Sequence, residues 1–166
     1  MKIGVPKEIK PQEHRIGLTP ESVKILVSEG HEVIVENNGG FEAGFDNEQY
    51  TNAGAKIASS ASDIFNDAEI IVKVKEPQKV EVDMIRENQI VYPYLHLAAA
   101  KELTEGLIKS KSINIAYETV TDDNGRLPLL APMSAVAGRM SVQAGAHCLE
   151  KNQKGRGLLL GGAPGV

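Results

Sequence analysis

Ionisable side chains of four different types lie at or after the ends of four predicted strands. They are Arg15, Lys75, His96 and Glu118, which follow or close the predicted strands at 2–5, 69–75, 89–92 and 112–118. In an open parallel sheet, ligands bind outside the carboxyl ends of the strands. We therefore expect these side chains to lie along one edge of the sheet, where they could form a site.

The chemistry of three of these groups suits a small keto acid or amino acid. The planar guanidinium of Arg15 can hold a carboxylate, and the ammonium of Lys75 can polarise a carbonyl oxygen. The imidazole of His96 can exchange a proton near neutral pH. Taken singly, each has a plainer interpretation, because loop Arg and Lys side chains are usually solvated. A histidine after a strand is often structural, and Glu118 could simply end its strand.

The segments that must position these residues alternate between strand and helix patterns, which predicts βαβ units on a parallel sheet. Further strands are predicted at 31–36 and 55–58, and helices at 19–30, 46–53, 63–68, 80–87 and 97–110. Thr19 and Pro20 form a typical helix start, and Gly30 a typical end. The predicted fold is α/β, a Rossmann-like or flavodoxin-like parallel sheet flanked by helices.

The character of the chain changes near residue 130. A long helix is predicted from Pro132 to about Lys151, followed by a strand at 157–160 and a Gly-rich tail. The tail does not match G-x-G-x-x-G, and no helix follows it, so it cannot cradle a pyrophosphate in the usual way. The pattern predicts one α/β domain at 1–130 and the start of a second domain at 131–166. Motifs that resemble a known family imply that the first is a substrate-binding domain and the second a truncated nucleotide-binding domain.

Composition excludes several classes of function. The 166 residues are 42% apolar and 24% charged with a net charge of −4, which does not favour nucleic-acid binding. No run approaches the roughly 20 apolar residues of a membrane span. The single Cys148 allows no internal disulfide, and its spacing from His147 fits no zinc site. We expect a cytoplasmic protein with no metal, membrane or nucleic-acid partner.

Five motifs, in order along the chain, resemble the alanine dehydrogenase family. They are MKIGVPKEIK at 1–10, EHRIGLTP at 13–20, VKVKEP at 72–77, YLHLAA at 94–99 and LLAPMS at 129–134. The resemblance implies NAD-dependent interconversion of L-alanine with pyruvate and ammonia, in a homohexamer. It also implies roles for single residues, carried over by position.

The implied catalytic residues are His96, as the acid/base group, and Lys75. The implied substrate-binding residues are Arg15, Lys75, Tyr94 and Met133, and the implied cofactor contact is Ser134. Glu118 falls in a matching segment as a neighbouring carboxylate, with weaker support.

Two departures from the family pattern stand out. Ala135 stands where the family commonly has Glu, and the G-x-G-x-x-G turn that the family carries further on is not among the 166 residues. We therefore expect this chain to supply a substrate pocket and to be inactive alone. The alternatives are a nucleotide-binding subunit of a proton-translocating transhydrogenase and a non-catalytic domain that binds a small acid. The segments 94–99 and 132–134 favour alanine dehydrogenase.

Overall fold

The computed structural model describes residues 1–165 and divides into two compact units, Met1–Thr119 and Val120–Val166. Each unit is described by itself below. The predicted domain boundary after residue 130 stays a prediction.

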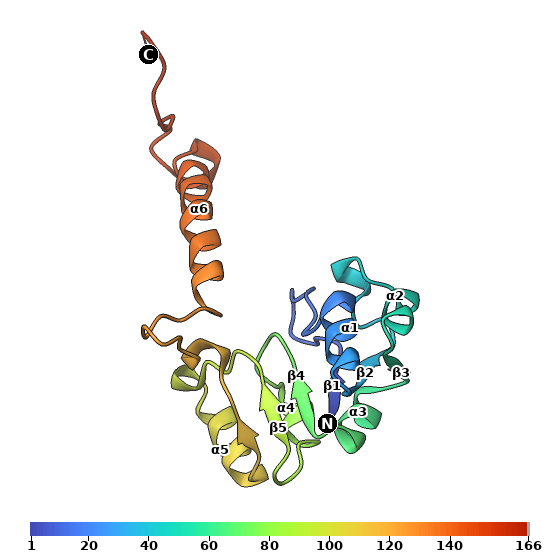
Figure 1. Cartoon of the computed structure of the whole chain (residues 1–166). Helices are drawn as coiled ribbons and strands as arrows, with labels where there is room; N and C mark the ends of the chain where they lie inside the picture. The colour runs from blue at the N-terminus through green and yellow to red at the C-terminus, as the bar shows by residue number, and fades with distance from the viewer. Residues whose placement is uncertain (166) are drawn as a thin grey trace. The chain divides into compact units, whose positions relative to one another are not determined.

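A six-stranded parallel sheet forms the centre of the first unit (Figure 1). Its strands are β1 (Lys2–Val5), β2 (Glu32–Glu36), β3 (Lys56–Ala58), β4 (Ile70–Val72), β5 (Ile90–Tyr92) and β6 (Ile113–Asn114). Their spatial order is β3-β2-β1-β4-β5-β6, so the chain reverses direction across the sheet between β1 and β4. This is the Rossmann order, not the flavodoxin-like one. The predicted parallel α/β sheet is confirmed.

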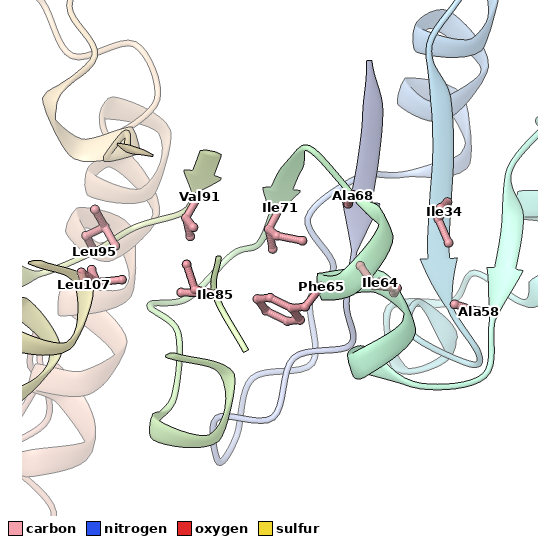
Figure 2. Close-up of a cluster of buried hydrophobic side chains, with 10 residues drawn as sticks. All are labelled: Ile34, Ala58, Ile64, Phe65, Ala68, Ile71, Ile85, Val91, Leu95 and Leu107. Carbon is pink, nitrogen blue, oxygen red and sulfur yellow. The ribbon is translucent and has the colours of Figure 1, made fainter. Parts of the chain in front are cut away.

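Helices cover both faces of this sheet. They are α1 (Pro20–Ser28), α2 (Asn47–Asn52), α3 (Ala61–Asp67), α4 (Lys79–Val82) and α5 (Lys101–Ser110), with short 3₁₀ turns η1 (Phe41–Ala43), η2 (Leu97–Ala99) and η3 (Tyr117–Thr119). Strand side chains alternate between the two faces. Ile34, Ile64, Phe65 and Leu107 belong to one buried cluster that extends along one face of the sheet (Figure 2). The neighbouring Val33 and Val35 join Val23 and Tyr50 in a cluster on the other face.

Local sequence accounts for how α1 begins and for how closely α3 approaches the sheet. The Thr19 hydroxyl accepts a hydrogen bond from the Ser22 amide, and Pro20 opens α1, as predicted. Gly4 of β1 lies directly under α3, and a Cβ there would be 2.4 Å from Cγ2 of Ile64. The missing side chain therefore lets α3 pack against the middle of the sheet.

Tertiary contacts shorten several predicted elements. The predicted strand at 69–75 ends at Val72, because the Val74 and Lys75 amides donate to the Glu8 carboxylate instead of a neighbouring strand. The predicted helix at 80–87 ends at Val82, and Arg86 beyond it donates to the carbonyls that end α3. The predicted helix at 97–110 is interrupted at Ala100, between η2 and α5.

At the sheet edge, the predicted strand at 112–118 is reduced to β6, and the chain turns into η3. β6 has a neighbouring strand on one side only. The amides of Ile115 and Tyr117 still donate to the carbonyls of Val91 and Pro93, but Pro93 has no amide hydrogen to donate in return, and the pairing with β5 ends there.

The second unit is built around one long helix, α6 (Ala131–Cys148), followed by η4 (Lys151–Gln153). None of the 18 residues of α6 is buried. The predicted strand at 157–160 is wrong: residues 157–159 have no regular structure, and the described part of this unit contains no strand with which they could pair. No helix within residues 1–165 is long and apolar enough to cross a membrane.

Candidate active site

The loop after β1 and the end of β4 meet at the point where the sheet order reverses. Gly17 carries the loop across the end of β4, where a Cβ would be 2.5 Å from the carbonyl oxygen of Val72. Because the obstacle is backbone, no side chain could be accommodated there without moving the loop. Ligands of doubly wound sheets bind in the crevice at such reversals.

A cavity of about 300 Å³ lies at this position. Its lining residues come from the loop after β1, the η1 region, and the segments that follow β4, β5 and β6. They are Arg15, Ile16, Gly17, Thr19, Ala43, Phe45, Lys73, Val74, Tyr94 and Tyr117. The predicted site residues Arg15 and Tyr94 are therefore brought together from segments about eighty positions apart in the chain.

Arg15 is held by the carboxylate of Glu13. Its Nε donates to Oε1 at 2.8 Å and one terminal nitrogen to Oε2 at 2.5 Å, so the pairing is bidentate. Hydrogen bonding from Arg15, aided by the charge of Lys75, lowers the pKa of Glu13 to about 2 although burial opposes this. Glu13 thus stays charged and fixes the plane of the guanidinium, whose side chain is 50% exposed.

A fully buried ion cluster supports the segment that carries Lys75. The ammonium of Lys73 lies 3.2 Å from Glu8 and 2.7 Å from Glu81, and all three side chains are at most 2% exposed. Burial raises the pKa of Glu81, against the opposing charge of Lys73. Oε1 of Glu8 also accepts the amides of Val74 and Lys75, at 2.6 and 3.3 Å. Glu8 therefore ties the backbone at Lys75 to the start of the chain.

The loop that carries His96 is held by Glu118. The two carboxylate oxygens of Glu118 accept the Leu95 amide at 3.0 and 3.2 Å, and Oε1 accepts the His96 amide at 2.7 Å. His96 has φ 52° and ψ 35°, a left-handed conformation that is uncommon for a residue other than glycine. Local backbone strain of this kind persists only where its surroundings enforce it, and Glu118 supplies that constraint.

Tyrosine rings form the wall of the cavity on the β5 and β6 side. The ring of Tyr117 stands edge-on to Tyr92 and to Tyr94, with centroids 4.2 and 4.9 Å apart. Such edge-to-face packing is favourable and rigid. Burial, with the neighbouring tyrosines and Glu8, raises the pKa of Tyr117, so its phenol stays neutral. The wall therefore offers apolar area and neutral hydroxyls to a small ligand.

The remaining predicted site residues do not line this cavity. Lys75 follows Val74 of the cavity wall, and His96 follows the Tyr94–Leu95 segment, but neither is among the residues that line the cavity. Met133 and Ser134 lie on α6 in the second unit, where the Ser134 hydroxyl donates to the Leu130 carbonyl at 3.4 Å.

Sequence reasoning missed four residues around this site, namely Glu8, Lys73, Glu76 and Glu81. For Lys73 and Glu81 the only signal of burial was that each lies between apolar residues, in the segments 70–74 and 80–82. The sequence around Glu8 and Glu76 carries no such signal.

A larger cavity of about 590 Å³ lies between α4 and the η2–α5 segment. Glu76 and Gly106 line it, but Arg15 and Tyr94 do not, and its walls are helix flanks. The smaller cavity therefore suits a small acid better. Within residues 1–165 no group of three or more His, Cys, Asp or Glu side chains could hold a metal ion.

Comparison with known proteins agrees with this fold. Residues 4–137 match the sequence model of the family described as alanine dehydrogenase/PNT, N-terminal domain. The whole chain is 54% identical to an alanine dehydrogenase from Halomonas elongata, of which it spans 45%. A solved structure of an L-alanine dehydrogenase superposes on the whole chain with a TM-score of 0.88 and 55% identity, over 46% of its own length.

A transhydrogenase from Sinorhizobium meliloti is a more distant match. Its structure covers 75% of this chain and 35% of its own length, with a TM-score of 0.70 and 27% identity. The chain belongs to the alanine dehydrogenase/PNT N-terminal domain family, and it spans less than half the length of the curated alanine dehydrogenases it matches.

Proposed function

We propose that this chain is the substrate-binding part of an NAD-dependent alanine dehydrogenase, which interconverts L-alanine with pyruvate and ammonia. The observation that carries the proposal is the cavity at the sheet reversal, in which Arg15 and Tyr94 line one small space. The 54% identity to an alanine dehydrogenase along the whole chain supports the choice of substrate.

Arg15 and Lys75 are the proposed substrate-binding groups. Arg15 pairs with the carboxylate of pyruvate or alanine, and Glu13 keeps its guanidinium in a fixed plane. Lys75 is held at its backbone by Glu8 and polarises the keto oxygen, which makes the carbonyl carbon more electrophilic. Tyr94 supplies the apolar wall, and Met133 is proposed as a further substrate-binding residue from family resemblance alone.

His96 is the proposed acid/base group. Addition of ammonia to C2 of pyruvate forms a C–N bond and gives a carbinolamine. Loss of its hydroxyl as water, with one proton delivered by the imidazolium of His96, then leaves the protonated imine and a neutral imidazole. In the reverse direction the neutral imidazole accepts a proton from the water that adds to the protonated imine. The fixed loop conformation at His96 would place this imidazole reproducibly.

The described residues do not fit a dinucleotide. The loop after β1, where a dinucleotide-binding fold has its glycines, carries the ion-paired side chains of Glu8 and Glu13 instead, so it lacks the glycines that let a backbone approach a pyrophosphate. The glycines at 161–165 follow no strand. NAD is thus proposed as the redox cofactor from family membership alone, with Ser134 as a contact, and no hydride step is assigned to this chain.

Two alternatives are less well supported. The transhydrogenase match is 27% identical over three quarters of the chain, whereas the L-alanine dehydrogenase match is 55% identical over all of it. A non-catalytic acid-binding domain would keep the Arg15 cavity but would not need a histidine in a constrained loop. A homohexamer and a cytoplasmic location complete the proposal, on family resemblance and the composition of the chain.

The test is pyruvate- and ammonia-dependent oxidation of NADH. We expect no turnover from the 166 residues alone, and turnover when they are joined to a dinucleotide-binding domain. His96→Gln should then reduce kcat by about 10²-fold or more with folding intact, the usual size of an acid/base contribution. Robust turnover by the 166 residues alone, or full activity of His96→Gln in the joined protein, would contradict the proposal.

A further inference from the structure

One buried carboxylate oxygen near His96 lacks a hydrogen bond. Oε1 of Glu76 is in contact with the ammonium of Lys10, whereas Oε2 is buried and has no hydrogen-bond partner within residues 1–165. An unsatisfied buried polar atom costs about 1–3 kcal/mol, and more when it is charged. Such an atom in a native fold calls for an explanation.

Nδ1 of His96, 3.8 Å away, is the nitrogen that faces this oxygen. The Glu76 side chain is 16% exposed and tethered by Lys10, while the imidazole is 55% exposed. A change in the side-chain torsions of His96 could close the remaining distance, because the ring is half-exposed while its backbone and the Glu76 carboxylate are held in place. Catalytic hydrogen bonds are often long before substrate binds and shorten afterwards.

The charges around Glu76 keep its carboxylate ionised. Burial favours the neutral acid, but the hydrogen bond from Lys10 and the charges of Lys10 and His96 outweigh it, so the pKa of Glu76 is lowered. An ionised carboxylate is a hydrogen-bond acceptor only. It can therefore accept a hydrogen bond from a protonated Nδ1, and it disfavours a lone pair on that nitrogen.

We propose that Glu76 is a positioning residue that acts through His96, by accepting a hydrogen bond from Nδ1–H and so holding the neutral imidazole in the Nδ1–H tautomer. Nε2 then carries the lone pair and is the nitrogen that exchanges protons with substrate. Which nitrogen of a histidine is protonated is set by the hydrogen bond that the other one makes. Lys10 fixes Glu76, and Glu118 fixes the backbone at His96, so the two carboxylates hold the ring and the loop separately. This inference rests on the proposed acid/base role of His96.

Tautomers can be read directly from the imidazole ¹⁵N chemical shifts of the uniformly labelled chain, at a pH where the rings are neutral. His96→Gln identifies the His96 signals among those of the four histidines. We expect the Nδ1–H pattern for His96 and a change to the Nε2–H pattern in Glu76→Ala. Glu76→Asp keeps the charge beside Lys10 but withdraws the oxygen by one methylene, and it should move the tautomer in the same direction.

The second unit offers a matched control. Nδ1 of His147 lies 3.5 Å from Oε1 of Glu150, both side chains being more than half exposed. Glu150→Ala should leave the His96 signals unchanged. If wild-type His96 shows the Nε2–H pattern, or if neither Glu76→Ala nor Glu76→Asp moves it, the inference is overturned. Should Glu76→Ala not fold, as judged from the Val5 and Val35 amide signals, Glu76→Asp decides alone.

Kinetics separate this inference from the function on which it rests. In the protein joined to its dinucleotide-binding domain, Glu76→Asp should lower kcat by about 10-fold or more and leave the KM for pyruvate within about 3-fold, because proton transfer is affected and carboxylate binding is not. Unchanged kcat in Glu76→Asp, with His96→Gln inactive, would sink the positioning role alone. An active His96→Gln would sink the acid/base role, whichever tautomer is observed.

Discussion

The two units of the chain differ in how far their apolar side chains are buried. The first unit buries Ile64, Phe65 and Ile71 completely between its sheet and helices (Figure 2). On α6 of the second unit, Val136, Met140 and Val142 are each more than half exposed. The hydrogen bonds that Glu8, Glu13 and Glu118 accept from the backbone or side chains beside the cavity all lie within the first unit. The comparison indicates that the substrate site has a buried core to support it, whereas no residue of α6 is buried.

The largest expected difference between the units is in core truncation. Phe65→Ala should lower the free energy of unfolding of the first unit by about 3–5 kcal/mol, because it leaves a cavity at the centre of the core. Val142→Ala removes an exposed side chain and should change stability by less than about 0.5 kcal/mol. Urea denaturation followed by circular dichroism measures both. Equal effects would mean that the two units are packed alike.

Removing a charged side chain should also cost more stability in the first unit than in the second. Lys73→Met leaves Glu8 and Glu81 buried without a counter-ion, and breaking such a pair costs about 3–5 kcal/mol. Lys151→Met in the second unit changes an exposed side chain and should cost less than about 0.5 kcal/mol. The same denaturation experiment checks both variants. A small loss of stability in Lys73→Met would show that the cluster does not support the site.

Glycine substitutions should have opposite signs in the two units. Gly17→Ala forces the loop away from the backbone of β4, and we expect a loss of about 1–3 kcal/mol and weaker ligand binding. Gly138→Ala meets nothing within 4 Å and removes a flexible residue from the middle of α6. It should stabilise the helix by about 0.5–1 kcal/mol, detectable as higher helix content. Destabilisation by Gly138→Ala would show that α6 is closely packed.

The smallest effect concerns pH. Because the pKa of Glu13 is lowered from 4.5 to about 2 by Arg15, its pairing stabilises the first unit fully above about pH 4.5. That contribution is lost as the pH falls from 4.5 towards 2, when the carboxylate takes up a proton. The carboxyl ¹³C shift of Glu13 should titrate near pH 2 in the wild type and at higher pH in Arg15→Gln. An unchanged titration in the variant would exclude the pairing.

Sequence patterns located all six strands, the start of α1 and the candidate residues at strand ends, because each depends on residues close together in the chain. The order of the strands in the sheet could not be predicted, because periodicity locates each strand along the chain but does not indicate which strands lie side by side. Nor was the role of Glu8, whose partner Lys73 is 65 positions away. Glu118 was placed near the site by its position at a predicted strand end, but its hydrogen bonds to the backbone at His96 follow from tertiary geometry alone. The strand predicted at 157–160 failed because apolar content cannot supply a pairing partner.

The central claim is that the cavity lined by Arg15 and Tyr94 binds a small 2-keto acid, and titration of the ¹⁵N-labelled chain with pyruvate tests it most directly. Saturable shifts should cluster at the amides of Arg15, Gly17, Val74 and Tyr94. Arg15→Lys should weaken binding by about 10-fold or more, because an ammonium cannot pair bidentately with a carboxylate. The absence of saturable shifts in the wild-type chain, or equal affinity in Arg15→Lys, would contradict the claim.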